Sequence, residues 1–272
     1  MTVSIAGCGW YGLSLAKWLG NKGFTVKGST TSIDKLPILA DAGIQPYLAD
    51  FSAAVPTFDP DFFICDILWI CIPPKARNGN GEAYITTIQR IIDGATRQGV
   101  KQVVLISSTS VYADDISEVN ELTQPNPNTA SGKVMLQAEE LLKQQTGFTT
   151  TIIRFAGLIG PGRNPGRFFA GKKDISNGDA PVNLIHLTDC IGVSLAILDQ
   201  NAFGHTYNAC TPDHPTKETF YTKAAIRSGL EKPEFISEKK DWKIISSLYV
   251  DGILNYTYQV NSLMSWLDKA IE

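Results

Sequence analysis

The sequence predicts an α/β protein with a doubly wound parallel sheet and a smaller C-terminal lobe. Two observations carry this prediction. Short apolar runs alternate with helix-like stretches up to residue 200, and a glycine-rich turn follows the first apolar run directly. Such alternation is typical of a parallel sheet with helices on both faces. The 272 residues suffice for one large α/β domain, or for a large domain with a small lobe.

Six strands are expected, and all of them are apolar without alternation, as in strands buried on both faces. They are predicted at residues 2–6, 24–28, 44–48, 67–72, 102–107 and 149–155. Helices are predicted between them, at residues 10–21, 33–42, 81–98, 129–145 and 188–198. Pro37 should interrupt the second helix early, because proline lacks the N–H that a helix interior needs.

The segment at residues 160–167, Gly-Pro-Gly-Arg-Asn-Pro-Gly-Arg, is too rich in glycine and proline for regular structure and is interpreted as a functional loop. Beyond residue 201 the pattern is less regular, with a short strand near Tyr207 and a helix near residues 215–228. We therefore assign residues 1–160 to a dinucleotide-binding Rossmann domain. Residues 161–272 should complete the sheet and form a small substrate-binding lobe over its carboxyl edge, where ligands of open α/β sheets bind.

Composition excludes several classes of partner. The formal net charge of −3 argues against a nucleic-acid ligand. Lys172, Lys173, Arg163 and Arg167 are the nearest approach to a basic cluster, and either a solvated loop or a contact to an anionic small molecule would explain them. The three histidines show no metal-ligand spacing, so no metal is expected. With neither a basic leader nor an apolar stretch of membrane-spanning length, a cytoplasmic protein without a membrane partner is expected.

The glycine-rich turn predicts a dinucleotide site. Gly7 would permit the tight turn, Gly9 would leave room for a pyrophosphate, and Gly12 would let the following helix pack close to the strand. The N-terminus of that helix favours phosphate binding. Because the triplet follows an apolar strand and opens a helix, we prefer this interpretation to a plain tight turn. The turn residues expected at the cofactor are Gly7, Gly9, Trp10, Tyr11 and Gly12.

The end of the second strand bears on the choice of cofactor. An NAD site usually carries a carboxylate there, which binds the ribose 2′-hydroxyl. This chain has Ser29, Thr30 and Thr31 instead, whose hydroxyls can donate to a 2′-phosphate. NADP is therefore favoured over NAD. No arginine stands near the end of the second strand, and Lys27 and Lys35 are the nearby cations.

The order of several motifs resembles the extended short-chain dehydrogenase/reductase superfamily over nearly the whole chain. Within it, the sequence is most similar to the NAD-dependent epimerase/dehydratase type that acts on nucleotide sugars. The residues that carry the resemblance are Gly7-x-Gly9-x-x-Gly12, Asp50-Phe51, Ser107-Ser108-Thr109-Ser110-Val111-Tyr112, Lys133 and Gly160-Pro161-Gly162. The resemblance implies a seventh strand and the strand order 3-2-1-4-5-6-7.

The resemblance also implies roles for single residues. Asp50 and the backbone of Phe51 would contact the adenine, and Ile72 and Pro73 would line the adenosine and nicotinamide ribose channel. Ser108 would bond the substrate oxygen, and Lys133 would bond the nicotinamide ribose. Arg154, with Arg163 and Arg167 of the 160–167 loop, would contact the substrate. His186 and Asp189, near a short strand and a helix start, are expected to be structural.

The sequence departs from the family at its catalytic tyrosine. That tyrosine stands four residues before the lysine, where this chain has Thr129. A threonine hydroxyl has too high a pKa to replace a phenol as general base. Tyr112 is the substitute candidate, although packing or a substrate contact is the favoured explanation of this tyrosine. Ser110 and Ser131 are weaker candidates.

Two functions follow. The first is an NAD(P)-dependent oxidoreductase, epimerase or dehydratase acting on a nucleotide sugar or a related polar metabolite, with Arg163 and Arg167 suited to a diphosphate. The second is an NAD(P)-binding redox sensor or regulator without turnover. A hydrolase is disfavoured, because the chain has neither a Gly-x-Ser-x-Gly elbow nor a Walker-type loop. The chain should be a monomer or a homodimer, the latter through the helices at 81–98 and 129–145.

Overall fold

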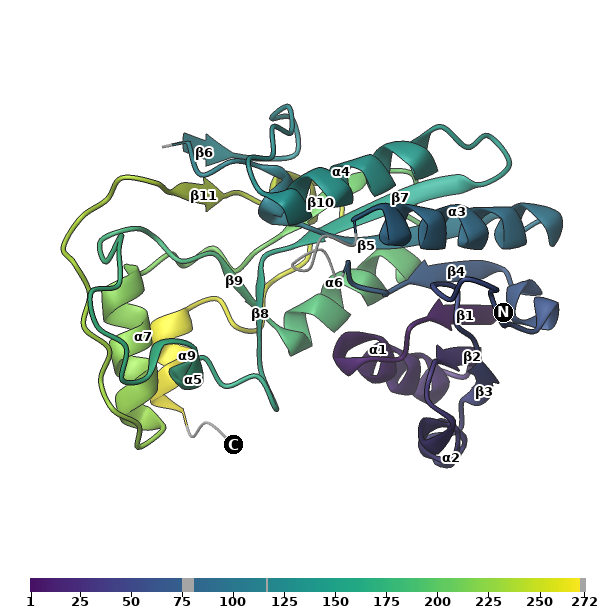
Figure 1. The fold of residues 1–272 in the computed structure, drawn as a ribbon, viewed down its shortest axis with the longest axis horizontal. Helices are drawn as coiled ribbons and strands as arrows, with labels where there is room; N and C mark the ends of the chain where they lie inside the picture. Colours follow the sequence, from purple (N-terminus) through teal and green to yellow (C-terminus); the bar gives the residue numbers. More distant parts are fainter. Residues whose placement is uncertain (75–80, 116, 270–272) are drawn as a thin grey trace. The chain divides into compact units, whose positions relative to one another are not determined.

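A seven-stranded sheet forms the centre of the computed structural model, which describes residues 1–74, 81–115 and 117–269 (Figure 1). The strand order is β3-β2-β1-β4-β5-β7-β10, which confirms the order expected from the family resemblance. The strands are β1 (Thr2–Ala6), β2 (Thr25–Thr30), β3 (Gln45–Leu48), β4 (Ile67–Ile70), β5 (Gln102–Ser108), β7 (Thr149–Phe155) and β10 (Thr206–Ala209).

The middle of the sheet is buried on both faces, as the apolar runs predicted. β1 pairs in parallel with β2 on one side and β4 on the other, so that Ile5 stands between Gly28 and Trp69. All four residues of β4 are buried. Parallel strands with helices on both faces need such continuous apolar runs, because neither face meets water.

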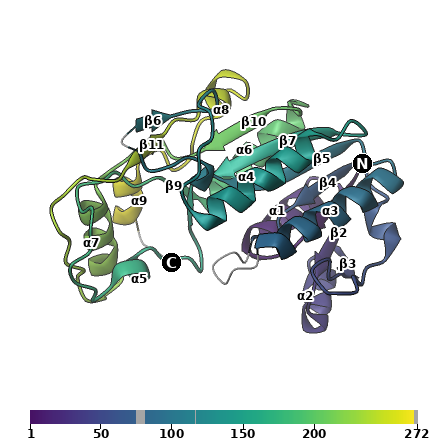
Figure 2. The ribbon, with the colours of Figure 1, turned by 45° about the horizontal axis from the view of Figure 1, so that its top comes forward.

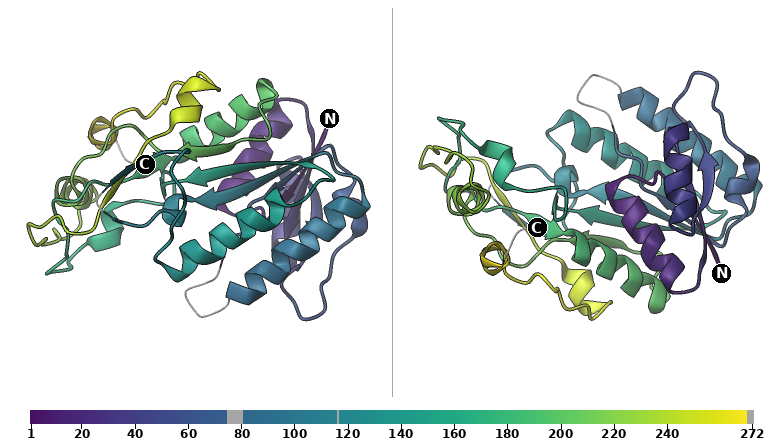
Figure 3. Two further views of the ribbon diagram at one scale, coloured as in Figure 1. Left: turned by 90° about the horizontal axis from the view of Figure 1, so that it is seen from above. Right: turned by 90° about the horizontal axis from the view of Figure 1, so that it is seen from below.

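Helices cover both faces of this sheet. Figure 3 shows α1 (Trp10–Asn21) on one face, with α3 (Gly81–Arg97) and α4 (Ala130–Lys143) on the other. The helix expected at 33–42 is instead a 3₁₀ turn at Ile33–Lys35 followed by α2 (Leu36–Asp41). Pro37 stands in the first turn of α2, where its missing N–H has no intrahelical partner in any case. Pro37 therefore helps to start the helix.

The chain divides into two compact units that interleave in sequence. Unit 1 comprises Met1–Val111, Thr129–Ile153 and Asn201–Thr206, and unit 2 comprises Tyr112–Asn128, Arg154–Gln200 and Tyr207–Glu272. A single boundary at residue 160 does not describe this division. The reason is a pairing between distant segments, because β6 (Ser117–Val119) pairs in parallel with β11 (Lys243–Ile245) within unit 2 (Figure 2).

Unit 2 has its own small core. β8 (Gly157–Ile159) pairs with β9 (Leu184–His186), and α7 (Lys217–Arg227) packs with α9 (Leu263–Asp268). Ile159, Leu184, Phe220 and Leu263 lie in this core. The remaining helices of the unit are α5 (Gly166–Phe169), α6 (Leu187–Asp199) and α8 (Leu248–Gly252).

The 160–167 segment corrects one expectation, since its last two residues are helical. A Cβ at Gly166 would lie 2.5 Å from the carbonyl oxygen of Ala224. Gly166 thus permits α5 to pack directly on the backbone of α7. The rest of the segment is irregular, as predicted, apart from an isolated bridge between Gly160 and Arg163.

Carboxylates join distant segments within unit 2. Glu121 accepts hydrogen bonds from the backbone N–H groups of Asn208, Leu248 and Tyr249. Asp189, at the start of α6, accepts from the N–H groups of Gln259 and Val260 at 2.7 and 3.0 Å. Such bonds to charged acceptors are stronger than neutral ones, so they hold the irregular C-terminal segment in place. Within the described residues, no helix is both long and apolar enough to cross a lipid bilayer.

Candidate dinucleotide site

The glycine-rich turn between β1 and α1 has the geometry that its glycines predicted. Gly7 adopts φ +96°, a left-handed conformation that favours glycine. A Cβ at Gly12 would lie 2.3 Å from the carbonyl oxygen of Gly7, so only glycine lets α1 approach the turn this closely. A Cβ at Gly9 would meet no atom within 4 Å. The turn therefore leaves open space at Gly9, where a pyrophosphate would need it.

A cavity of about 420 Å³ opens beside this turn. Nine of the predicted cofactor residues line it, namely Gly7, Gly9, Ser29, Thr30, Thr31, Asp50, Phe51, Ile72 and Pro73. Its volume falls in the ordinary range of small-molecule sites. Trp10 and Tyr11 lie in the first turn of α1 and are not among its lining residues.

Lys35, one of the two cations noted near the second strand, also lines the cavity. The lining residues that the sequence did not suggest are Cys8, Ala49, Ser52, Cys71, Ala83, Tyr84 and Thr87. Ala83, Tyr84 and Thr87 lie on one face of α3. Their spacing in the sequence could have indicated that they share this face. The sequence could not show, however, that this face turns toward the cavity.

The end of β2 both supports the glycine-rich turn and lines the cavity. The Ser29 hydroxyl accepts a hydrogen bond from the Gly7 N–H at 2.9 Å, and the Ser29 carbonyl accepts one from Cys8 at 2.8 Å. Ser29 therefore holds the glycine-rich turn in place. Thr30, Thr31 and Lys35 complete this wall of the cavity.

The two lysines near β2 point in different directions. The ammonium of Lys27 donates to the carbonyl oxygens of Asp61 and Ile64, at 2.5 and 2.9 Å, and its side chain is buried. Lys35, by contrast, lines the cavity. Among the described residues, Lys35 is therefore the cation that the fold brings to this wall.

The turn after β3 also lines the cavity, next to the end of β2. Asp50 Oδ1 accepts hydrogen bonds from the Ser52 N–H, the Ser52 hydroxyl and the Ala53 N–H, at 2.6–3.1 Å. Arg90 of α3 donates to the carbonyl oxygens of Phe51 and Ala53, at 2.7 and 2.6 Å. These contacts fix the backbone that the family places beside the adenine.

Two thiols line the cavity without adding negative charge. Burial raises the pKa of Cys8 to about 12 and the pKa of Cys71 well above its ordinary value. Both groups are therefore neutral near pH 7. Close by, the Tyr84 hydroxyl donates to the Ile72 carbonyl at 3.1 Å and holds the chain after β4. A pyrophosphate bound here would meet no thiolate.

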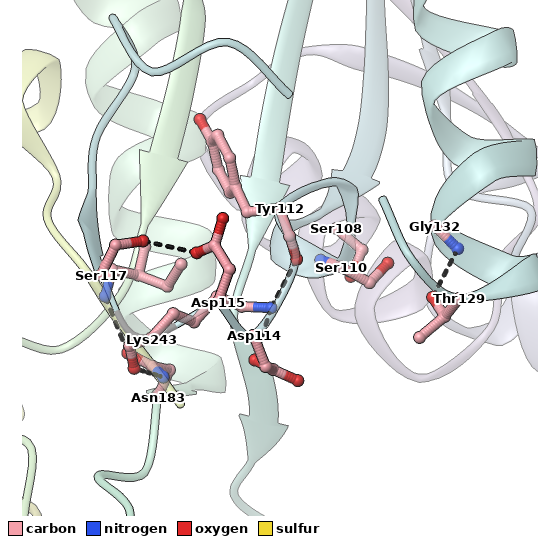
Figure 4. A network of polar contacts seen from close by, with 11 residues as sticks. Ser108, Ser110, Tyr112, Asp114, Asp115, Ser117, Thr129, Gly132, Asn183 and Lys243 are labelled. Carbon is pink, nitrogen blue, oxygen red and sulfur yellow. Dashed lines mark hydrogen bonds and ion pairs between the residues drawn. The ribbon is translucent and has the colours of Figure 1, made fainter. Parts of the chain in front are cut away.

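The candidate catalytic residues of unit 1 lie on elements that pack together. Ser108 ends β5, and its hydroxyl accepts a hydrogen bond from the Ser110 N–H at 3.1 Å. Lys133 stands in the first turns of α4, and α4 packs against the 3₁₀ turn Thr109–Val111. Thr129 is the N-cap of α4, and its hydroxyl accepts from the Gly132 N–H at 3.1 Å (Figure 4). The residue in the tyrosine's place is thus a helix cap.

Tyr112 lies in unit 2 with its hydroxyl engaged. Arg154 donates to this hydroxyl at 2.6 Å, and the Asn120 carbonyl and Asn208 Oδ1 lie 2.9 and 3.1 Å away. Burial raises the pKa of Tyr112, although Arg154 opposes the shift. Arg154 is itself only 2% exposed. These contacts favour a structural role for both residues over the catalytic and substrate roles that the sequence suggested.

A polar network that the sequence did not reveal holds the backbone after Tyr112. Lys243 donates to the Tyr112 carbonyl at 2.7 Å and pairs with Asp114 at 3.0 Å (Figure 4). Asn183 accepts from the Ile245 N–H and donates to the Lys243 carbonyl. The partners are 60 or more residues apart in sequence, so no local pattern marks them.

Ser131 lies in α4 of unit 1, and the remaining predicted residues belong to unit 2. Arg163 and Arg167 are exposed in the 160–167 segment. His186 is the N-cap of α6, accepting from the Thr188 N–H, and Asp189 stands in the first turn of that helix. Both have the structural roles expected of them. The described residues contain no cluster of three side chains able to hold a metal ion.

Comparison with known proteins agrees with this geometry. A family model described as "NAD(P)H-binding" matches residues 7–189. The chain belongs to this family. Protein YeeZ of Escherichia coli K12 is 37% identical over 262 residues, which cover 94% of this chain and 95% of that protein.

Solved structures share the fold over the whole chain. MoeE5 in complex with UDP-glucose and NAD aligns with a TM-score of 0.82 at 18% identity, covering 100% of this chain and 97% of that one. UDP-glucuronic acid 4-epimerase from Bacillus cereus, in complex with NAD, aligns with a TM-score of 0.81 at 18% identity, covering 100% and 96%. The expected Rossmann-type fold is confirmed by these structures, and the expected NAD(P)-binding family by the family model.

Proposed function

We propose that this protein binds NADP(H) in preference to NAD(H) and uses it for hydride transfer with a nucleotide sugar or a related polar metabolite. The observation that carries the cofactor choice is the wall at the end of β2, where Thr30, Thr31 and Lys35 line the cavity. Among the described lining residues Asp50 is the sole carboxylate, and it follows β3 rather than β2.

The charge at this wall suits a 2′-phosphate. A lysine attracts the phosphate dianion and hydroxyls donate to its oxygens, whereas a carboxylate in the same place would repel it. Lys27 does not compete for the role, because its ammonium is bonded to two carbonyl groups. The NAD complexes of the solved relatives, at 18% identity, support the fold and leave the cofactor of this chain open.

Replacing Lys35 tests the cofactor choice. We expect Lys35→Ala to raise the Kd for NADPH about tenfold, since an exposed charged contact contributes on the order of 1 kcal/mol and a phosphate contact somewhat more. The Kd for NADH should stay within twofold. Lys17→Ala, an exposed lysine of α1 outside the cavity, is the matched control. A wild-type preference for NADH, or an equal loss for both cofactors, would show that Lys35 does not face a 2′-phosphate.

The proposed chemistry uses Ser108 and Lys133. A bound nicotinamide would supply or accept the hydride. By resemblance to the family, the Ser108 hydroxyl would bond the substrate oxygen and Lys133 would bond the nicotinamide ribose. In the oxidative direction the substrate carbon loses a hydride and its hydroxyl loses a proton, which would leave past Ser108 to solvent. Thr129 takes no proton in this scheme, because its oxygen caps α4.

A second function, cofactor binding without turnover, is favoured by two observations. The residue in the place of the family tyrosine is a helix cap, and the hydroxyl of Tyr112 is bonded by Arg154. A sensor or regulator needs the cofactor cavity and no acid–base group.

An absorbance assay separates the two functions. The protein is mixed with NADP⁺ or NADPH and with UDP-glucose, UDP-glucuronic acid or UDP-N-acetylglucosamine, and the nicotinamide absorbance is followed. Turnover that is lost in Ser108→Ala and retained in Thr129→Val supports the enzyme. Tight NADPH binding with neither an absorbance change nor a new sugar product for any of these sugars supports the sensor.

A further inference from the structure

A second cavity lies in unit 1, and it shares no lining residue with the dinucleotide cavity. Its volume is about 390 Å³. It opens between the segment at residues 56–63 and the last two turns of α3. A volume of this size holds a small organic molecule.

Four of its nine lining residues are aromatic or proline, and Phe63 among them is fully buried. The rings of Phe58 and Phe63 meet edge to face with centroids 5.7 Å apart, and Pro56 and Pro60 stand beside them. Gly94 of α3 supports this arrangement, because a Cβ there would lie 2.4 Å from the Phe63 ring. Glycine inside a helix costs about 1 kcal/mol relative to alanine, and here it lets the ring lie against the helix backbone. A planar, apolar group fits such a wall best.

The polar groups at the rim give the cavity a positive charge. Arg97, in the last turn of α3, is exposed and makes no hydrogen bond or ion pair with the described residues. Asp93 accepts a hydrogen bond from Gln89 at 2.9 Å. Arg90 donates to the backbone carbonyls of Phe51 and Ala53. Arg97 is therefore the group able to bind an anion that enters the cavity.

We propose that this cavity is a binding site for a small aromatic monocarboxylate, with the ring against Phe58 and the two prolines and the carboxylate on Arg97. The guanidinium group suits a carboxylate, because its paired N–H groups match the two oxygens. The site is separate from the dinucleotide cavity, and the proposal does not depend on which cofactor the chain uses.

Ligand-observed fluorine NMR tests this site with 4-(trifluoromethyl)benzoate as the probe. We expect its resonance to broaden on addition of the wild-type protein, and equally in the presence of saturating NADPH. 4-(Trifluoromethyl)benzamide, which has the same ring without the charge, should bind about fivefold more weakly, because an exposed charge pair contributes up to ~1 kcal/mol.

Variants locate the probe. Arg97→Ala should weaken benzoate binding about fivefold and leave benzamide binding unchanged, and Arg97→Lys should restore part of the loss. Lys101→Ala, an exposed cation just beyond α3 and outside the cavity, should have no effect. Three results would each overturn the proposal: no broadening with the wild type, displacement of the probe by NADPH, or equal benzoate binding by wild type and Arg97→Ala.

Discussion

Two glycines of the same turn should respond oppositely to a side chain, because one faces open space and the other faces backbone. Gly9 has φ −82°, which any residue adopts, and a Cβ there meets nothing within 4 Å. Gly9→Val should therefore fold, with a stability change within about 1 kcal/mol from the lost N-cap glycine. Its β-branched side chain would fill the space that the pyrophosphate needs, and NADPH affinity should fall at least about a hundredfold, which corresponds to ~3 kcal/mol.

Gly12→Ala should mainly lower the stability of the fold, and reduce the NADPH affinity less. Its Cβ would lie 2.3 Å from the Gly7 carbonyl oxygen, so α1 or the turn must move by roughly an ångström to reach an ordinary contact distance. Overpacking of this kind costs about 1–3 kcal/mol, and the better helix propensity of alanine offsets up to ~1 kcal/mol of it. For a chain of this size, a net loss of about 1–2 kcal/mol lowers the Tm by about 2–8 °C.

Thermal unfolding followed by circular dichroism and NADPH fluorescence titration measure both variants. Gly9→Val should keep the wild-type Tm within a few degrees and lose binding. Gly12→Ala should have a lower Tm than the wild type. Its NADPH affinity should fall only if the altered packing also moves the glycine-rich turn. Wild-type NADPH affinity in a folded Gly9→Val protein would refute the placement of the pyrophosphate at this turn.

Three further predictions concern other contacts. Arg90→Ala should raise the Kd for NADPH about threefold to tenfold, because it frees the turn at residues 50–53 that lines the cavity; a titration showing unchanged affinity would contradict this. Burial lowers the pKa of His186 in the folded protein. The neutral His186 ring therefore contributes its full stabilisation above pH 6.5, the ordinary pKa of histidine. This stabilisation is lost as the pH falls through the lower pKa of the folded state. The protonated ring can no longer accept the Thr188 N–H, and about 1 kcal/mol of cap energy should disappear in urea unfolding at pH 5 relative to pH 7.5. His186→Asn, which caps without titrating, should lack that part of the pH dependence, and an unchanged pH profile would argue against the mechanism. Glu121→Ala should lower the free energy of unfolding by about 1–3 kcal/mol, since three backbone N–H groups lose a charged acceptor; a Tm equal to that of the wild type would contradict the role of this carboxylate.

The strands and the glycine-rich turn were predictable because local chemistry specifies them. In an α/β chain, apolar runs without alternation usually form strands that are buried on both faces. β1 and β7 have the predicted bounds. Helix starts were also close to prediction, because cap residues such as Thr129 act over a few residues.

The division into units was not predictable in the same way. A boundary at residue 160 follows the order of motifs along the chain, whereas unit 2 recruits residues 112–128 through the pairing of β6 with β11. A strand of three residues carries almost no sequence signal. Only the long-range pairing shows where such a strand belongs.

The amino-acid sequence by itself determined the glycine-rich turn, the buried apolar strands and the absence of a tyrosine four residues before Lys133. These depend on residue types at short spacing, which the chain displays directly. The tertiary structure alone decided that Lys35 rather than Lys27 lines the cavity, and that Tyr112 has its hydroxyl bonded to Arg154. Such outcomes depend on partners 34 or more residues away, because a long side chain bonds whichever group the fold brings within reach.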